Sequence, residues 1–218
     1  MYLTLQPHPC FAGRRLNPCF RYNIVTLAQK LAKKLKTPRQ VQTYLRTLPY
    51  NREKEGETLA SAQTALRRGR LHCFEAAMAA AAILEHHGYP PLVMSLESKD
   101  GLDHVIYVFK QKGRWGAVAR SRDEGLNGRP PRYRSLRDLA WSYYDPYVDK
   151  TGKIKAYQVA HLDDCAPHWR DSPRNLWQAE QYLIKLKHRP LKSSPARYKK
   201  LHAAYLARGP MPKQKHWW

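Results

Sequence analysis

The strongest constraint on the fold is a stretch of alanines that begins just after Cys73. Residues 76, 77 and 79–82 are all alanine, and Glu75 is the one polar residue between Cys73 and Leu84. A helix that is apolar nearly all round belongs in the interior of a protein. We therefore predict a central helix from Cys73 to about His86, ended by Gly88 in a left-handed conformation and packed closely against a sheet.

The stretches that follow this helix supply the predicted sheet. Residues 91–98, 103–110 and 114–120 have the composition of strands, and Lys112-Gly113 suits a two-residue hairpin turn between the last two. A further strand is predicted over 156–162. Helices are predicted over residues 24–35, from Pro38 onward with Val41, Tyr44 and Leu45 inward, and over 58–68, 135–144, 174–187 and 196–208. This order predicts an α+β fold.

Length and composition agree with a folded protein. The chain has 218 residues, of which 43% are hydrophobic, enough for one sizeable domain with extensions. No apolar run is long enough to span a membrane and the first residues lack a signal pattern, so we expect a cytoplasmic protein without a membrane partner. The predicted organisation is a basic helical extension over 1–47, a central domain over 48–164, and basic helices with a tail over 165–218.

The formal charge of +22 lies mainly in the two flanks. Residues 1–52 contain ten Lys or Arg and no acid, and residues 174–218 contain eleven with Glu180 as the one acid. Residues 53–173 are close to balanced, with eighteen basic and sixteen acidic side chains. The basicity is therefore separate from the segment that carries Cys73.

The basic flanks admit two interpretations. The lysines of the first predicted helix form either a solvated face or a surface for an acidic protein; they are Lys30, Lys33, Lys34 and Lys36. Aromatic residues interleaved with basic ones in the second flank would suit stacking on nucleic acid; they are Tyr198, Tyr205, Trp217 and Trp218. Tyr198 and Tyr205 recur with Leu201 at helical spacing, which instead favours packing in a core.

The four cysteines are expected to be free thiols, because no signal sequence points to an oxidising compartment. They are Cys10, Cys19, Cys73 and Cys165. Pairing of the first two, or metal binding by them, is the alternative, although their spacing matches no strong zinc pattern. His72, His86 and His87 are candidate metal ligands with Cys73, but two histidines at a helix end more often provide a favourable charge there. We predict no metal and no cofactor.

Cys73 and His104 form the candidate catalytic pair. A helix N-terminus lowers the pKa of a thiol and so favours the nucleophilic thiolate, and Cys73 lies in the first turn of the predicted helix. His104 lies at the start of the strand predicted over residues 103–110 and is the candidate base. Backbone N–H groups of the same turn would stabilise an oxyanion. The structural alternatives are that Cys73 is a small core residue and His104 a half-exposed strand residue.

The hairpin register predicts the third member of this site. If Gln111 pairs with Arg114, His104 lies opposite Ser121, and Asp123 follows on the same face of the sheet. Either side chain would then accept a hydrogen bond from the imidazole, as in Cys-His-Asp sites. A register slip of one residue would remove both from that face. Asp123 is otherwise part of a polar loop over 120–125.

Several stretches resemble bacterial transglutaminase-like proteins of the papain-like superfamily. The resemblance spans roughly residues 48–164, and its most specific part is a cysteine helix followed by a histidine strand. It is carried by residues 48–51, 56–59, 72–77, 103–105, 113–118, 133–140 and 142–144. It implies a nucleophile at the start of the central helix and a base on an adjacent strand, at the positions of Cys73 and His104. The third position does not carry over, so Asp123 and Ser121 stay open.

Three functions follow from these features. The first is a cysteine enzyme that transfers acyl groups from amides of peptides or proteins, as a protease, amidase, deamidase or transglutaminase. The second is a module that binds nucleic acid or another acidic partner through the basic flanks. The third is a catalytically inactive papain-like scaffold kept for such interactions.

Overall fold

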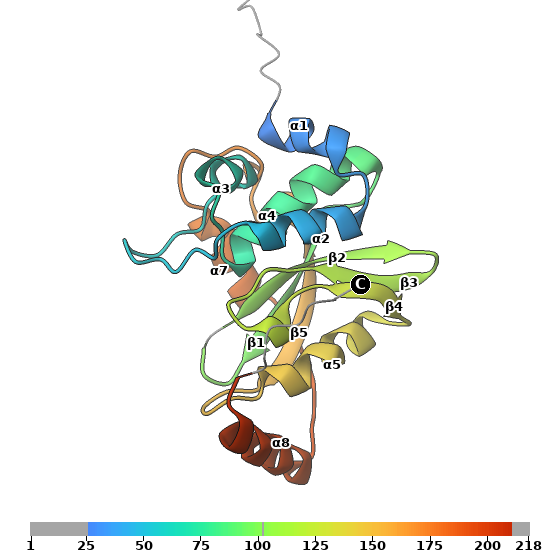
Figure 1. Cartoon of the computed structure of the whole chain (residues 1–218), viewed down its shortest axis with the longest axis vertical. Coiled ribbons are helices and arrows are strands. Elements are labelled where there is room, and N and C mark those ends of the chain that lie inside the picture. The colour runs from blue at the N-terminus through green and yellow to red at the C-terminus, as the bar shows by residue number, and fades with distance from the viewer. Residues whose placement is uncertain (1–25, 102, 211–218) are drawn as a thin grey trace, which may run out of the picture.

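The computed structural model describes residues 26–101 and 103–210. Within them six strands form one antiparallel sheet in the order β4-β3-β2-β1-β5-β6. Figure 1 shows α1 to α4 on one side of this sheet and α5 with α8 on the other. The predicted α+β class is confirmed.

The elements have the following bounds. The helices are α1 Leu27–Lys34, α2 Pro38–Thr47, α3 Ala62–Arg68, α4 Cys73–Leu84, α5 Leu136–Tyr147, α6 Leu162–Cys165, α7 Trp177–Lys185 and α8 Pro195–Arg208, with short 3-10 turns η1 Glu85–His87 and η2 Glu124–Leu126. The strands are β1 Leu92–Ser98, β2 His104–Gln111, β3 Arg114–Val118, β4 Arg129–Tyr133, β5 Ile154–His161 and β6 Arg189–Pro190.

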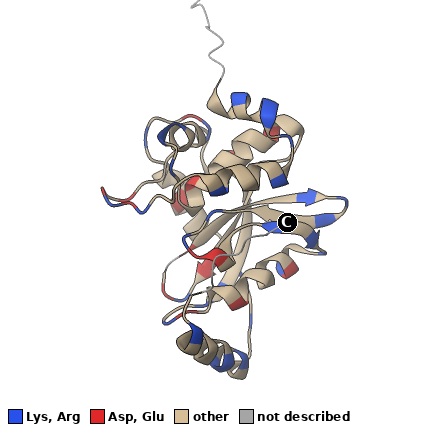
Figure 2. Cartoon of the chain, in the orientation of Figure 1, with Lys and Arg blue, Asp and Glu red and all other residues tan. Residues whose placement is uncertain are grey.

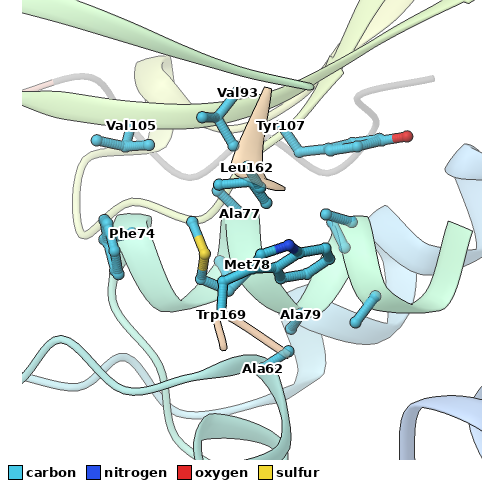
Figure 3. Close-up of a cluster of buried hydrophobic side chains, with 14 of the residues drawn as sticks. Ala62, Phe74, Ala77, Met78, Ala79, Val93, Val105, Tyr107, Leu162 and Trp169 are labelled. Atoms are coloured by element: carbon cyan, nitrogen blue, oxygen red, sulfur yellow. The ribbon is translucent and has the colours of Figure 1, made fainter. Parts of the chain in front are cut away.

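Helix α4 is the centre of the larger hydrophobic core. Every residue from Phe74 to Leu84 is buried, so the prediction of a central helix is confirmed. Figure 3 shows Val93, Val105 and Tyr107 pointing from the strands toward Ala77 and Met78 of the helix. Because alanine ends at Cβ, the helix can approach the sheet closely, and the position of its first turn is fixed by this contact.

The alternate residues of β2 serve a second core on the other face of the sheet. Ile106 and Val108 contact a cluster that includes Tyr143 and Tyr144 of α5, while Tyr107 belongs to the α4 cluster. Strand β2 is therefore buried on both faces over most of its length. Successive strand side chains point to opposite faces, which is how one strand can join two cores.

Both predicted flanks contribute to the α4 core. Ala28 and Val41 come from α1 and α2, and Trp169 and Leu183 come from beyond residue 164. Lys30, Lys33, Lys34 and Lys36 are exposed, as both the solvated-face and the acidic-partner interpretations require. Cys10, Cys19, Ile24, Trp217 and Trp218 lie outside the described residues.

Glycines at the predicted turns adopt the expected backbone conformations. Gly69 and Gly88 end their helices with φ of 64° and 78°, and the Lys112-Gly113 turn has φ of 48° and 75°. Positive φ at both central residues matches the twist of a two-residue hairpin. The hairpin register from Gln111–Arg114 to Tyr107–Val118 is as predicted.

Several elements differ from the sequence prediction: α6, β4 and β6 are not predicted, and β3 ends at Val118 and not at residue 120. The helix predicted from residue 58 begins at Ala62, because Ser61 caps it and the preceding residues run extended to contact α4. Strand β4 was not predicted, since Pro130 and Pro131 lack the N–H that a strand uses for pairing. Proline is tolerated there because β4 is an edge strand. Among the described residues, no helix is both long and apolar enough to cross a bilayer.

The close packing of α4 makes a testable prediction. Ala79 is fully buried, so Ala79→Leu should overpack the core and lower the free energy of unfolding by about 1–3 kcal/mol. Ala203→Leu, on the exposed surface of α8, is the matched control and should change it by less than about 0.5 kcal/mol. Denaturant unfolding followed by circular dichroism measures both, and equal stability of the two variants would contradict the packing described for α4.

Candidate active site

The start of α4 opens into a cleft. Cys73 is the first residue of the helix, is partly exposed, and lines a cavity of about 590 Å³ together with His72 and His104. The first backbone N–H groups of a helix have no acceptor within the helix and carry the positive end of its dipole. The thiol is therefore placed where a negative charge is stabilised.

His104, the first residue of β2, is oriented toward the thiol by a backbone carbonyl. Its Nε2 donates a hydrogen bond of 2.8 Å to the carbonyl oxygen of Leu126, which leaves Nδ1 for the hydrogen bond that the imidazole forms with Cys73. The ring is 3% exposed and lies 6.0 Å from the ring of Tyr143. The structure thus brings the predicted nucleophile and base together.

The third predicted residue lies in the cleft but has a different partner. The carboxylate of Asp123 contacts the guanidinium of Arg122 at 3.4 Å, and the Ser121 hydroxyl accepts a hydrogen bond from the backbone N–H of Asp123 at 3.1 Å. The role predicted for them, accepting a hydrogen bond from His104, belongs to the carbonyl of Leu126.

The reason for this difference is the end of β3. The strand ladder stops at Val118, and the chain beyond it is held by side chains: the amide of Gln42 bonds both the N–H and the carbonyl of Ala119 at 2.9 Å. Asn127 then accepts from the N–H of Ser121 at 3.1 Å. The chain consequently turns back at η2, and this turn carries the Leu126 carbonyl to His104.

A second imidazole contacts the thiol. His72 is the residue before the helix, is 7% exposed, and hydrogen-bonds with Cys73. Its Nε2 donates to the carbonyl oxygen of Thr58 at 2.7 Å and lies 3.6 Å from a carboxylate oxygen of Glu53. A further carboxylate, that of Glu75, is 3.7 Å away. The ring is therefore fixed at one nitrogen and adjacent to two negative charges.

The two imidazoles set the ionisation of the site. Burial opposes ionisation of Cys73, but hydrogen bonds with His104 and His72 and the charges of both rings outweigh it and hold the pKa of the thiol well below its ordinary value. Burial likewise lowers the pKa of His72, yet its hydrogen bond with Cys73 and the nearby negative charges raise that pKa to about 9. Near neutral pH the site therefore holds a thiolate beside an imidazolium.

Glu75 anchors the residues around this ion pair. Its side chain is fully buried in the first turn of α4 and accepts hydrogen bonds from the backbone N–H groups of His72 and Ala60, at 3.2 and 3.3 Å. It also accepts from the side-chain amide of Asn51 at 3.1 Å and lies 3.7 Å from Arg68. One carboxylate thus joins the helix start to the segment that covers it.

The other histidines considered as metal ligands are not near Cys73. His86 and His87 lie in η1, at the opposite end of the 12-residue helix, which puts them about 18 Å away. The Nε2 of His87 is instead 3.0 Å from the carbonyl oxygen of Ala32. In the described part of the chain, no three His, Cys, Asp or Glu side chains are grouped so as to hold a metal ion.

Comparison with known proteins adds no relative: no family model matches the sequence, and no curated protein matches it. The resemblance to transglutaminase-like proteins stays a prediction from the residues. Residues 48–51, one of the stretches that carry it, lie beside the start of α4, where the N–H of Asn51 donates to the carbonyl of Leu71 at 3.1 Å.

Sequence reasoning missed the contribution of three groups. The sequence suggests His72 only as a metal ligand and gives no role to Glu75, and Leu126 acts through its backbone. The signal for the first two is a capping-box spacing, in which Glu75 follows the N-cap residue by three positions. Histidine in place of the usual serine or threonine obscured it. The carbonyl of Leu126 could not be predicted, because every residue has a backbone carbonyl and no side-chain pattern indicates which one accepts a hydrogen bond.

Titration of the thiols tests the site. In a Cys10→Ser/Cys19→Ser background, alkylation of Cys73 by iodoacetamide should be at its plateau rate below pH 8, because thiolate is lost only as pH falls through its lowered pKa. Removing one hydrogen bond in His104→Ala should move the midpoint upward. Mass spectrometry at each pH measures both.

Cys165 is the internal control for this experiment. Burial raises its pKa to about 12, so it should stay unlabelled in the folded protein at pH 7. A wild-type Cys73 midpoint at the free-cysteine value of about 8.5 would contradict the site described above.

Proposed function

We propose that this chain is a cysteine-dependent acyl-transfer enzyme that acts on amide bonds and has a papain-like, transglutaminase-like core. The observation that carries the proposal is the Cys73 thiol, which lines a cleft at the first turn of a helix together with His72 and His104, the two imidazoles that lower its pKa. Structural cysteines are inert and apolar, whereas a thiol of strongly lowered pKa in an accessible site is a nucleophile.

The chemistry proceeds in two halves. The Cys73 thiolate attacks the carbonyl carbon of the amide, and the N–H groups of the first turn of α4 stabilise the oxyanion that forms. The His104 imidazolium gives its proton to the amide nitrogen, the C–N bond breaks, and the amine leaves behind a thioester. Water, or an amine in a transferase, then gives a proton to neutral His104 while attacking the thioester, and the C–S bond breaks to restore the thiolate.

The two histidines have separate tasks in this scheme. His104 exchanges the proton, because Nε2 is held by the Leu126 carbonyl and Nδ1 is the nitrogen left for the reaction. His72 keeps its proton near neutral pH, since its pKa is about 9, and its positive charge holds Cys73 as thiolate. The thiolate therefore does not depend on His104 staying charged during the proton transfers.

The alternative function, binding of nucleic acid or an acidic protein, rests on the outer surface. Figure 2 shows Lys and Arg on α1, α2, α8 and the far ends of β2 to β4. Of the aromatic residues predicted to stack on bases, Tyr198 packs against the second core and lies under Lys153, whose Nζ is 4.4 Å from the ring centre. A basic surface could bind such a partner whether or not the protein is an enzyme. The reactivity of the Cys73 thiol is therefore the property that distinguishes an enzyme from an inactive scaffold.

Loss-of-function variants test the proposed reaction. Cys73→Ala should lower cleavage of an unfolded protein substrate, and incorporation of a fluorescent amine into it, by at least about 10³-fold. His104→Ala should cost about 10²–10⁴-fold. Asp123→Asn should stay within about threefold, because its carboxylate pairs with exposed Arg122.

Cys165→Ala is the matched cysteine control and should retain activity. Gel electrophoresis reports the hydrolysis and in-gel fluorescence reports the transfer. Activity that persists in Cys73→Ala would overturn the proposal.

The pH profile tests the separate task of His72. His72→Gln removes the charge and retains a hydrogen-bond donor, so the acid limb of kcat/KM should move up by about 1 pH unit or more as the thiol pKa rises. His168→Gln, an exposed histidine outside the cleft, should leave the profile in place, and the same profile in His72→Gln would contradict this role.

A further inference from the structure

The cleft around Cys73 has the opposite charge from the rest of the protein. Within the described residues, seven Asp and Glu side chains line it, against two Lys or Arg side chains, Arg122 and Arg208. Among the described residues, no lysine lines it. The chain has a net charge of +22, yet the cleft at the thiol is negative. Such a cleft favours a positively charged substrate.

Two of these carboxylates already have a positive partner. Glu53 lies 3.6 Å from His72 and Asp123 lies 3.4 Å from Arg122. Three others, Glu57, Asp103 and Glu180, form no ion pair with lysine or arginine in the described part of the chain. Asp103 does accept a hydrogen bond from the backbone N–H of Ser98 at 3.1 Å, but no lysine or arginine among the described residues neutralises any of the three through an ion pair.

These three carboxylates come from different walls of the cleft, and two of them act on the third, Glu180. Glu57 precedes α3, Glu180 lies on α7, and Asp103 lies between β1 and β2. Burial raises the pKa of Glu180, and repulsion by Glu57, Glu53 and Asp103 raises it further. The pKa of Asp103 is raised as well, chiefly by burial. A cation placed among them would relieve this repulsion.

Apolar groups adjoin the carboxylate of α7. Trp177 and Ile184 line the same cleft and are 45% and 56% exposed. They stand three residues before and four residues after Glu180, so the three side chains share one face of the helix. Lysine and arginine have an apolar stem and a charged end, and both cations bind over the face of tryptophan.

We propose that the substrate is a peptide segment rich in lysine or arginine, which lies extended in the cleft with its cationic side chains at Glu57, Glu180 and Asp103. A single small amine would satisfy one carboxylate, whereas acids on three separate walls match several cations spaced along a chain. This inference rests on the proposed function in assuming that the bound peptide is cleaved or acts as the acyl donor. Binding of the peptide can be measured without turnover.

Binding is measured first on the full-length Cys73→Ala chain, by fluorescence anisotropy. Three labelled octapeptides are used that differ only in carrying lysine, norleucine or glutamate at alternate positions. The lysine peptide should bind at least about tenfold more tightly than the norleucine peptide at low salt, and the difference should shrink as salt screens the charges. The positive charge of the whole protein would favour the glutamate peptide, so that order of affinities would overturn the proposal.

A variant pair assigns the effect to the cleft. Glu57→Gln/Glu180→Gln should reduce the lysine-to-norleucine ratio by about tenfold. Asp164→Asn/Asp171→Asn removes the same charge from exposed positions outside the cleft and should retain the ratio. Equal ratios in the two double variants would overturn the assignment.

Turnover separates this inference from the proposed function. Lysine-peptide binding by Cys73→Ala, with no cleavage or amine transfer by the wild-type chain, would support the cationic ligand and refute the enzyme. Cleavage of norleucine and lysine peptides with equal kcat/KM would support the enzyme and refute the cationic preference.

Discussion

The buried carboxylate of Glu75 is the interaction on which the site depends. A charge in a protein interior is costly unless donors surround it, and here the donors come from the helix start, from Asn51 and from Ala60, with Arg68 nearby. The same contacts that satisfy the carboxylate fold the segment over residues 51–60 against α4. That segment brings the Thr58 carbonyl to His72. The hydrogen bonds to the Glu75 carboxylate thus also position His72 beside the Cys73 thiol.

The two imidazoles differ because their surroundings differ. His72 is placed among carboxylates, which favour its charged form, whereas His104 is placed against Tyr143 and a backbone carbonyl. One ring is suited to hold a charge and the other to exchange a proton. The thiolate between them is stabilised in the ground state by a group that the proposed reaction never deprotonates.

The sequence predicts most of this architecture because its signals are local. The alanine run, the glycines at helix ends and the Lys112-Gly113 turn each impose one backbone conformation, and all three are found. Cys73 and His104 follow from those elements. What could not be predicted depends on contacts between distant segments: β4 pairs despite its prolines, and Gln42 replaces strand pairing at Ala119. The partner of His104 changes for that reason.

The Leu126 carbonyl has a consequence for how such sites are recognised. Every amino acid supplies the same backbone oxygen at position 126, so this role does not depend on a side-chain functional group; the Leu126 side chain is buried in the second core. A search for cysteine, histidine and carboxamide or carboxylate side chains in fixed geometry would pass over this arrangement. Orientation of the base is encoded instead in the length and shape of the turn between β3 and β4, so an insertion or deletion in this turn would displace the acceptor of His104.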